Sequence, residues 1–349
     1  MKATPSAITL KDIAEKAGVS ITTVSRILNH RETGIPIRDE TRQRVISVAT
    51  ELGYKPNLLA RGLRGGTRSS LVGVIMRDIS DPFHIQILQG IHECATRRDY
   101  RFFLGHVDFR PDAAIAYGSI FEESHADGII IIGDIEGDEA ALEVLAQQHR
   151  YLVGATDRIA RRQYPGVYAD SAQGTLLALD HLWGLGHRNI ICVSDPRIRD
   201  GRQRVEVYQE YMREHGIEKK IRVYLTSQDP QASYQVGEEI FSSFNGTDRP
   251  TAIYAASDTL AIYLMQAAFQ AGVSIPEQIS IVGFDNIDIC PFTIPPLTTI
   301  NQFGVQMGES AANLLLDMIE KNQDASDVND IVISPTLVVR QSASVPPGY

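Results

Sequence analysis

The chain has 349 residues, of which 43% are hydrophobic and 22% are charged. This composition is typical of a globular protein with two or three cores, and it excludes disordered chains, collagen-like repeats and disulfide scaffolds. The longest apolar run, residues 129–132, is too short to cross a bilayer, and the N-terminus lacks the apolar stretch of a signal peptide. The three cysteines form no metal-binding spacing. We therefore expect a cytoplasmic protein without a membrane partner, a cofactor or a metal.

Charge is distributed unevenly along the chain. Residues 1–68 hold 12 basic and 6 acidic side chains, whereas the other 281 residues hold 21 and 37. A polyanion such as DNA would repel the acidic body and attract the basic head. The overall net charge of −10 therefore conceals a basic N-terminal module.

Residues 8–54 contain three apolar patterns with helical spacing, at residues 10–17, 24–28 and 45–52. A capping box formed by Thr9 and Asp12 opens the first helix. Gly18 ends it, because only glycine adopts a left-handed conformation without strain.

Ser20 is expected to cap the second helix. The spacing of the small Ala14, the turn glycine and the apolar Val24 predicts a helix-turn-helix. In this arrangement the outer face of the second helix carries Ile21, Thr22, Ser25, Arg26 and Asn29. Arginine and asparagine there could reach base edges; the alternative is a solvated helix face in an unrelated bundle.

From residue 71 onward, short apolar runs alternate with amphipathic helices. The runs are residues 71–76, 101–105, 128–132, 151–155, 189–193, 222–225, 251–255 and 279–284, with late strands expected at 331–333 and 337–339. Continuous apolar strands separated by helices predict parallel α/β sheets. The length of this part favours two lobes.

Ligands in two-lobed parallel sheets bind beyond the C-terminal ends of the strands. The residues that lie at or beyond the ends of the predicted strands and could bind a hydroxyl-rich ligand are Phe83, Asp134, Asp157, Arg158, Arg204, Tyr254, Asp258 and Asp285. Carboxylates and a guanidinium supply paired hydrogen bonds, and aromatic rings supply a flat apolar face. Each of these residues also has a purely structural interpretation. Asp285 could cap a turn, Phe83 could belong to the core of a lobe, and Arg204 could be a solvated charge on a helix. His84 is not included.

Two other functions are compatible with an α/β body. An enzyme is disfavoured, because the chain has no nucleophile-elbow, phosphate-loop or paired-histidine metal motif. A transport receptor would share the cleft, but the basic head and the lack of a signal peptide argue against it.

The chain resembles the LacI/GalR (lactose-repressor) family from residue 8 to about residue 342. The resemblance rests on these matching segments: 9–14, 17–20, 23–26, 28–29, 41–42, 52–54, 56–57, 60–63, 81–83, 127–130, 186–188, 257–258, 282–285, 295–299 and 337–340. It implies an effector-controlled regulator, a repressor of carbohydrate-related genes. As a homodimer it would bind a near-palindromic double-stranded DNA operator.

The resemblance also implies roles for individual residues. Ile21 and Thr22 would set operator preference, and Ile21 would suit a thymine methyl group. DNA contacts are expected from Thr9, Ser20, Ile21, Thr22, Thr23, Ser25, Arg26, Asn29, Arg38, Tyr54, Asn57, Ala60 and Leu63. Arg38 departs from the family, which usually has a capping serine there, and it could reach a phosphate.

Residues 56–64 could form a short hinge helix that is too short to be stable in the free protein. By resemblance it would enter the minor groove, with Leu63 as an apolar wedge and Ala60 beside it. The alternative is a plain linker whose leucine packs on the body.

The expected domains are a helix-turn-helix domain (1–55), a hinge and linker (56–70) and a two-lobed effector and dimerisation domain (71–349). The first lobe would comprise about 71–170 with 301–325, and the second about 171–296 with 330–342. The resemblance assigns effector binding most firmly to Phe83, Arg204 and Asp285. A sugar-like effector is expected; the alternatives are a nucleobase, an anionic metabolite binding the arginine clusters, or control by a protein partner.

Overall fold

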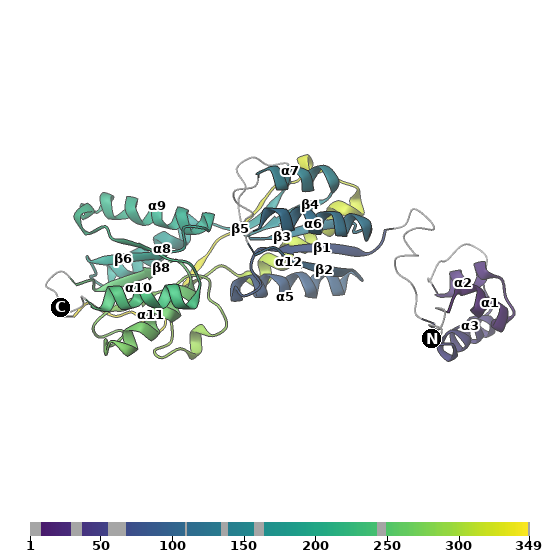
Figure 1. Ribbon diagram of the computed structural model, residues 1–349, viewed down its shortest axis with the longest axis horizontal. Helices are drawn as coiled ribbons and strands as arrows, with labels where there is room; N and C mark the ends of the chain where they lie inside the picture. Colours follow the sequence, from purple (N-terminus) through teal and green to yellow (C-terminus); the bar gives the residue numbers. More distant parts are fainter. Residues whose placement is uncertain are drawn as a thin grey trace, which may run out of the picture. The chain divides into compact units, whose positions relative to one another are not determined.

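The computed structural model describes residues 8–28, 37–54, 68–108, 110–133, 139–156, 164–242 and 249–347. The chain divides into two compact units, Met1–Ser69 and Ser70–Tyr349 (Figure 1). The predicted DNA contacts Asn29, Asn57, Ala60 and Leu63 lie outside the described residues, as do the predicted effector contacts Asp134, Asp157 and Arg158. No helix in these ranges is long and apolar enough to span a membrane.

The first unit contains three helices: α1 (Leu10–Ala17), α2 (Ile21–Leu28) and α3 (Asp39–Glu51). One small core joins them, formed by Ile13, Ala14, Ala17, Val24, Ile27, Val45 and Ala49. Gly18 has φ 64° at the end of α1, so the left-handed turn expected of this glycine is present. This turn brings α2 back against α1.

The first lobe of the second unit is built on a six-stranded parallel sheet in the order β11-β5-β4-β3-β1-β2. Its strands are β1 (Leu71–Met76), β2 (Arg101–His106), β3 (Gly128–Ile132), β4 (Leu152–Ala155), β5 (Gly166–Ala169) and β11 (Ile331–Ile333). Helices α5 (Pro82–Arg97) and α12 (Gly304–Lys321) cover one face, and α6 (Pro111–Glu123) and α7 (Glu139–Gln148) cover the other (Figure 1).

The backbones of α5 and α12 touch. A methyl group added to Gly308 would lie 1.9 Å from the carbonyl oxygen of Ile87, and one added to Gly90 would lie 1.9 Å from that of Val305. Glycine is therefore required on both helices at this crossing. Because α12 lies late in the chain, the first lobe is complete only when residues from the C-terminal third of the chain have joined it.

The second lobe is a four-stranded parallel sheet in the order β7-β6-β8-β9. Its strands are β6 (Ile190–Ser194), β7 (Val223–Leu225), β8 (Ala252–Ala255) and β9 (Ser280–Val282). Helices α8 (Ser171–Gly184) and α9 (Arg199–Glu214) lie on one face, with α10 (Pro230–Ser242) and α11 (Asp258–Gln270) on the other (Figure 1). Short 3-10 turns occur at Glu218–Lys220, Cys290–Phe292 and Ala325–Asp327.

Three features differ from the sequence prediction. Strands β5 and β10 (Thr299–Asn301) were not predicted; β10 pairs antiparallel with β12 (Thr336–Val338). Strand β11, which was expected in the second lobe, pairs with β5 in the first. β2 is an edge strand with Phe103 and Leu104 exposed, rather than buried on both faces. Strands of three or four residues, such as β5, β10 and β11, are too short for periodicity to place them.

His187 holds the C-terminal segment against the second lobe. Its Nε2 atom lies 2.8 Å from the carbonyl oxygen of Ser344 and 3.0 Å from Oγ of Ser280, and its Nδ1 atom lies 2.9 Å from Oγ1 of Thr251. Burial lowers the pKa of His187 from the ordinary value of 6.5. The folded protein therefore favours the neutral ring.

This lowered pKa predicts a loss of stability in mild acid. The unfolded chain binds a proton near pH 6.5 that the folded ring resists, so the stabilisation is complete above that pH and declines as the pH falls below it. Denaturant unfolding between pH 8 and pH 5 should show this decline. The slope should be smaller in His187→Gln, whose side chain does not titrate. Burial also lowers the pKa of His84 and His181, so the variant should keep part of the pH dependence of its stability. An equal slope in the two proteins would contradict the assignment to His187.

Candidate functional site

Helix α2 presents an exposed face at its N-terminal end. Ile21 is 45% exposed and Thr22 is also exposed, whereas Ser25 and Arg26 are half-buried one turn later. The Ser20 hydroxyl accepts a hydrogen bond from the backbone N–H of Thr23 at 3.1 Å, which caps the helix as expected. The exposed isoleucine offers an apolar contact for a thymine methyl group, and the threonine offers a hydroxyl for a base edge or a phosphate.

The other predicted DNA contacts of the head have different surroundings. Thr9 caps α1: its Oγ1 accepts from the N–H of Asp12 at 3.4 Å, and the Asp12 carboxylate accepts from the N–H of Thr9 at 2.7 Å. Arg38 is exposed immediately before α3 and makes no capping hydrogen bond. Tyr54 is half-buried and packs on the core of the head.

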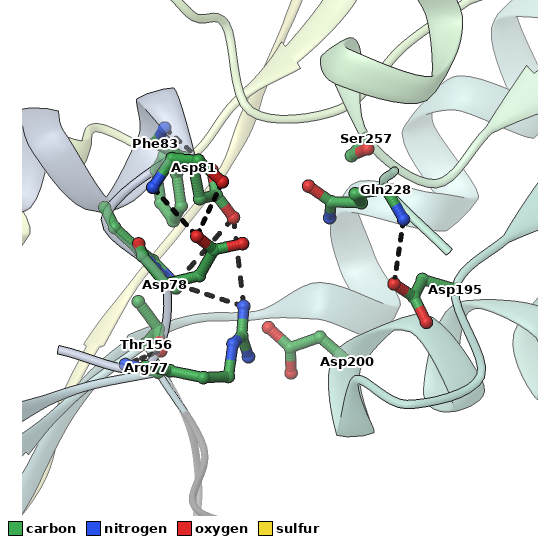
Figure 2. A network of polar contacts seen from close by, with 12 residues as sticks. Arg77, Asp78, Asp81, Phe83, Thr156, Asp195, Asp200, Gln228 and Ser257 are labelled. Carbon is green, nitrogen blue, oxygen red and sulfur yellow. Dashed lines mark hydrogen bonds and ion pairs between the residues drawn. The ribbon is translucent and has the colours of Figure 1, made fainter. Parts of the chain in front are cut away.

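A cavity of about 460 Å³, including its open side, lies between the two lobes of the second unit. From the first lobe it is lined by Arg77, Asp81, Phe83, His84 and Thr156. From the second lobe and the crossing segment it is lined by Ser194, Asp195, Ile198, Asp200, Gly201, Arg204, Gln228, Ala256, Ser257, Leu260, Asp285 and Gln302. Figure 2 shows Arg77 and Asp200 extending into this space from opposite walls.

The first-lobe wall is organised by Asp81 at the start of α5. Its Oδ1 accepts from the N–H of Phe83 at 2.9 Å, which caps the helix and fixes the position of the phenylalanine (Figure 2). Its Oδ2 lies 3.8 Å from the guanidinium of Arg77, which also lies 3.2 Å from Nε2 of His84. Burial lowers the pKa of His84, so this ring is neutral at physiological pH.

The second-lobe wall is organised by Arg204 on α9, which is 5% exposed. Its Nε donates to Oγ of Ser171 at 2.9 Å, and its Nη1 donates to the carbonyl oxygen of Ala256 at 2.6 Å. The guanidinium lies 3.6 Å above the ring of Phe284 and 3.5 Å from the carboxylate of Asp200. These contacts fix the planar group at the edge of the cavity.

Asp285 faces Arg204 from the loop after β9. Its Oδ1 accepts from Nε2 of Gln302 at 2.6 Å and lies 4.0 Å from Nη1 of Arg204. Its backbone has φ 123°, a conformation that L-residues rarely adopt. Burial raises the pKa of this carboxyl well above its ordinary value, although Arg204 acts in the opposite direction. As a neutral carboxyl this side chain can donate a hydrogen bond to a ligand hydroxyl, and as a carboxylate it can accept one.

Asp195 forms the far side of the cavity. Its carboxylate binds the guanidinium of Arg197 through Nε at 3.0 Å and Nη2 at 2.7 Å, and it accepts from the N–H of Gln228 at 3.1 Å (Figure 2). Gly201 allows α9 to begin here, because an added methyl group would lie 2.4 Å from the carbonyl oxygen of Asp195. The arginine of this pair is thus already neutralised by the protein.

Two predicted effector residues do not line the cavity. Asp258 is fully buried, and its carboxylate accepts from Thr299 Oγ1, from the N–H of Ile287 at 3.0 Å and from the thiol of Cys290. Burial raises its pKa to about 6. The Tyr254 hydroxyl lies 2.9 Å from that of Thr175 in the core. Asp258 anchors the loop that carries Asp285, and Tyr254 belongs to the core of the second lobe.

Comparisons with known proteins identify the chain. Residues 9–57 match the model of bacterial regulatory proteins, lacI family, and residues 179–343 match a periplasmic binding protein-like domain. The HTH-type transcriptional regulator DegA of Bacillus subtilis (strain 168) is 32% identical over 339 residues, covering 96% of this chain and 98% of DegA. The chain belongs to the lacI family of bacterial regulatory proteins.

Solved structures of this family have the same fold. The Lac repressor dimer, bound to operator and the anti-inducer ONPF, has a TM-score of 0.84 at 24% identity, covering 97% of this chain and 99% of that chain. A LacI family transcriptional regulator from Enterococcus faecium with bound ribose has a TM-score of 0.70 at 28% identity, covering 79% and 99%. The predicted head and two-lobed α/β body are thereby confirmed. Because the chain belongs to the lacI family of regulatory proteins, it is a DNA-binding transcriptional regulator and not an enzyme.

Among the predicted effector residues, the structure brings together Phe83, Arg204 and Asp285 around one cavity. Several lining residues were not predicted, among them Arg77, Asp81, His84, Asp195, Gln228 and Gln302. For two of them the sequence carries a signal, because Arg77 and Asp195 directly follow apolar strands, the same rule that selected Phe83. Gln302 lies on a crossing segment after β10, for which the sequence offers no such rule.

Proposed function

We propose that this regulator is a repressor that binds a near-palindromic operator as a homodimer and responds to a small hydroxyl-rich effector in the interlobe cavity. The observation that carries the effector assignment is that an aromatic ring (Phe83), a fixed guanidinium (Arg204) and a carboxyl group (Asp285) line the same cavity. The flat ring offers an apolar face to a sugar ring, and the two polar groups offer paired hydrogen bonds to its hydroxyls.

The charges of the described wall favour a neutral effector over an anionic one. The carboxylates of Asp81 and Asp200 match the two arginines of the wall, Arg77 and Arg204, while Asp195 is paired with Arg197 and burial raises the pKa of the Asp285 carboxyl. Both arginines lie beside carboxylates of the protein. An anion would have to compete with these carboxylates, so a sugar phosphate or sugar acid is the weaker candidate. The ribose bound to the Enterococcus faecium regulator supports a neutral sugar.

The proposed homodimer has candidate surfaces on both lobes. Exposed apolar side chains occur on α5 at Ile85, on the edge strand β2 at Phe103, and in the second lobe at Phe292 and Ile294. Large exposed apolar groups are typical of interaction surfaces. A two-fold dimer would place two heads on two operator half-sites, as the dimer named in the Lac repressor structure supports.

Within this proposal, the head reads bases through Ile21 and Thr22, with Ser25 and Arg26 beside them. The hinge residues Asn57, Ala60 and Leu63 would enter the minor groove. We propose that the effector acts by changing how the two bodies present this hinge.

A thermal-shift screen of the full chain against neutral sugars, sugar phosphates, sugar acids, nucleobases and nucleosides tests the effector assignment. A ligand of the cavity stabilises the folded protein by mass action, by about 2.7 kcal/mol at one hundred times Kd. We expect neutral sugars to raise the melting temperature, and Asp285→Asn to abolish the rise. Glu210→Gln, on the exposed side of α9, is the control and should retain it. A rise only with anionic compounds, or a rise that survives Asp285→Asn, would contradict the proposal.

A further inference from the structure

A side chain of the first lobe reaches across to the loop that carries Asp285. Gln86 lies on α5, one turn after Phe83. Its amide nitrogen donates to Oδ1 of Asp288 at 2.8 Å and lies 3.3 Å from the carbonyl oxygen of Asn286. Asp288 and Asn286 belong to the second lobe, in the loop that follows β9. One amide group thus joins the two lobes beside the cavity.

The loop that Gln86 contacts is held from several sides. Asp258 accepts from the N–H of Ile287, and Arg340 donates to Oδ1 of Asn286 at 2.7 Å. The backbones of Asp285 and Asn286 have φ 123° and 57°. A segment in this strained conformation keeps its geometry only while its neighbours constrain it, and Gln86 supplies one such constraint from the opposite lobe.

The other end of the loop returns to the same helix. Gln302 donates to Asp285 and is followed by Phe303 and α12, whose backbone touches that of α5 at Gly308 and Gly90. A methyl group on Gly304 would lie 2.9 Å from Cβ of Gln86 and 3.0 Å from Cε2 of Phe83. The ring of Phe83, the amide of Gln86 and the carboxyl of Asp285 are therefore parts of one closed set of contacts.

We propose that Gln86 is a positioning residue that latches the two lobes together through Asp288 and thereby sets the separation of Phe83 and Asp285 across the effector cavity. The inference rests on the proposed function of that cavity. The latch acts through one charged acceptor, so its strength depends on the charge of the side chain at position 86. A cation would strengthen it, and an anion would repel Asp288.

Pulsed EPR distances between the lobes test the latch without any effector. Spin labels are attached at Glu122→Cys on α6 and Arg213→Cys on α9, both exposed positions, in full-length protein diluted with unlabelled chains. Gln86→Glu should lengthen the mean interlobe distance by more than about 2 Å and broaden its distribution. Gln86→Lys should keep the distance short and the distribution narrow. A residue that only fills space would respond equally to the two substitutions, so opposite responses identify the latch.

Two controls sharpen the test. Gln89, on the same helix, donates to Glu93 one turn on, and Gln89→Glu should leave the distances unchanged. In an Asp288→Asn background, Gln86→Lys and Gln86→Glu should give the same distance, because the charged acceptor is gone. Equal responses to Lys and Glu in the native background, or a shift with Gln89→Glu, would overturn the proposal. These distances are measured without any sugar, so their outcome does not depend on the thermal-shift screen. Failure of the latch proposal can therefore be distinguished from failure of the effector proposal.

Discussion

Replacing Arg204 with methionine is expected to destabilise the second lobe by about 3–5 kcal/mol and to abolish sugar binding. The guanidinium is buried and contacts Ser171, Ala256, Asp200 and Asp285. Removing one partner of a buried ionic network leaves the others desolvated and unpaired. Arg204→Lys should recover little, because a single ammonium group cannot reproduce the planar set of donors. Denaturant unfolding and the thermal-shift response to sugars measure the two effects.

Arg213→Met on the same helix is the matched control. Arg213 is exposed and pairs with Glu210 at 3.1 Å, and exposed pairs contribute about 0–1 kcal/mol. Its unfolding free energy and its sugar response should both stay close to those of the native protein. An Arg204→Met protein as stable as this control would show that the buried contacts of Arg204 are not essential to the fold.

Substituting alanine for Gly308 is expected to cost more than about 2 kcal/mol of stability. The new methyl group would lie 1.9 Å from the carbonyl oxygen of Ile87, so α12 and α5 would have to move apart along their crossing. Overpacking of this kind typically costs about 1–3 kcal/mol, and here the contact is with backbone, which cannot rotate away. The cost exceeds the gain of about 1 kcal/mol that alanine gives over glycine in a helix.

Gly184→Ala, at the end of α8, separates the steric cost of an added methyl group from the gain in helix propensity. A methyl group there would meet no atom within 4 Å, so only the helix-propensity gain should remain, and its melting temperature should be unchanged or higher. If Gly308→Ala melted at the same temperature as Gly184→Ala, the close approach of α5 and α12 would not govern the stability of the first lobe.

The sequence predicts this fold well where single elements carry a complete pattern. Thr9, Asp12, Gly18 and Ser20 give the caps and the turn of the head from local hydrogen bonding alone. Long apolar strands such as β3 can be placed because both faces are buried. Phe83 follows from its position after β1, at the edge of the sheet where ligands bind.

Partners that are distant in the chain explain what could not be predicted. Asp258 follows a strand as a ligand-binding carboxylate should, but Ile287, Cys290 and Thr299 use its oxygens in the core. His84 reads as a loop residue, yet Arg77 and Asp81 enclose it in the cavity wall. A carboxylate or an imidazole can either line a ligand cavity or serve a purely structural role. Which of the two it does depends on side chains contributed by other elements.

The pairing of β11 with β5 has a consequence for synthesis of the chain. The last strand and the longest helix of the first lobe, β11 and α12, are translated after the four-stranded sheet of the second lobe and its covering helices. At about 5–20 residues per second, β5 and the inner face of α5 must wait roughly ten to thirty seconds on the ribosome for these partners. During that interval an unpaired strand edge and an apolar helix face are open to chaperones and to neighbouring chains. We expect the body to acquire protease resistance in one step, after the C-terminal third has emerged, and not lobe by lobe.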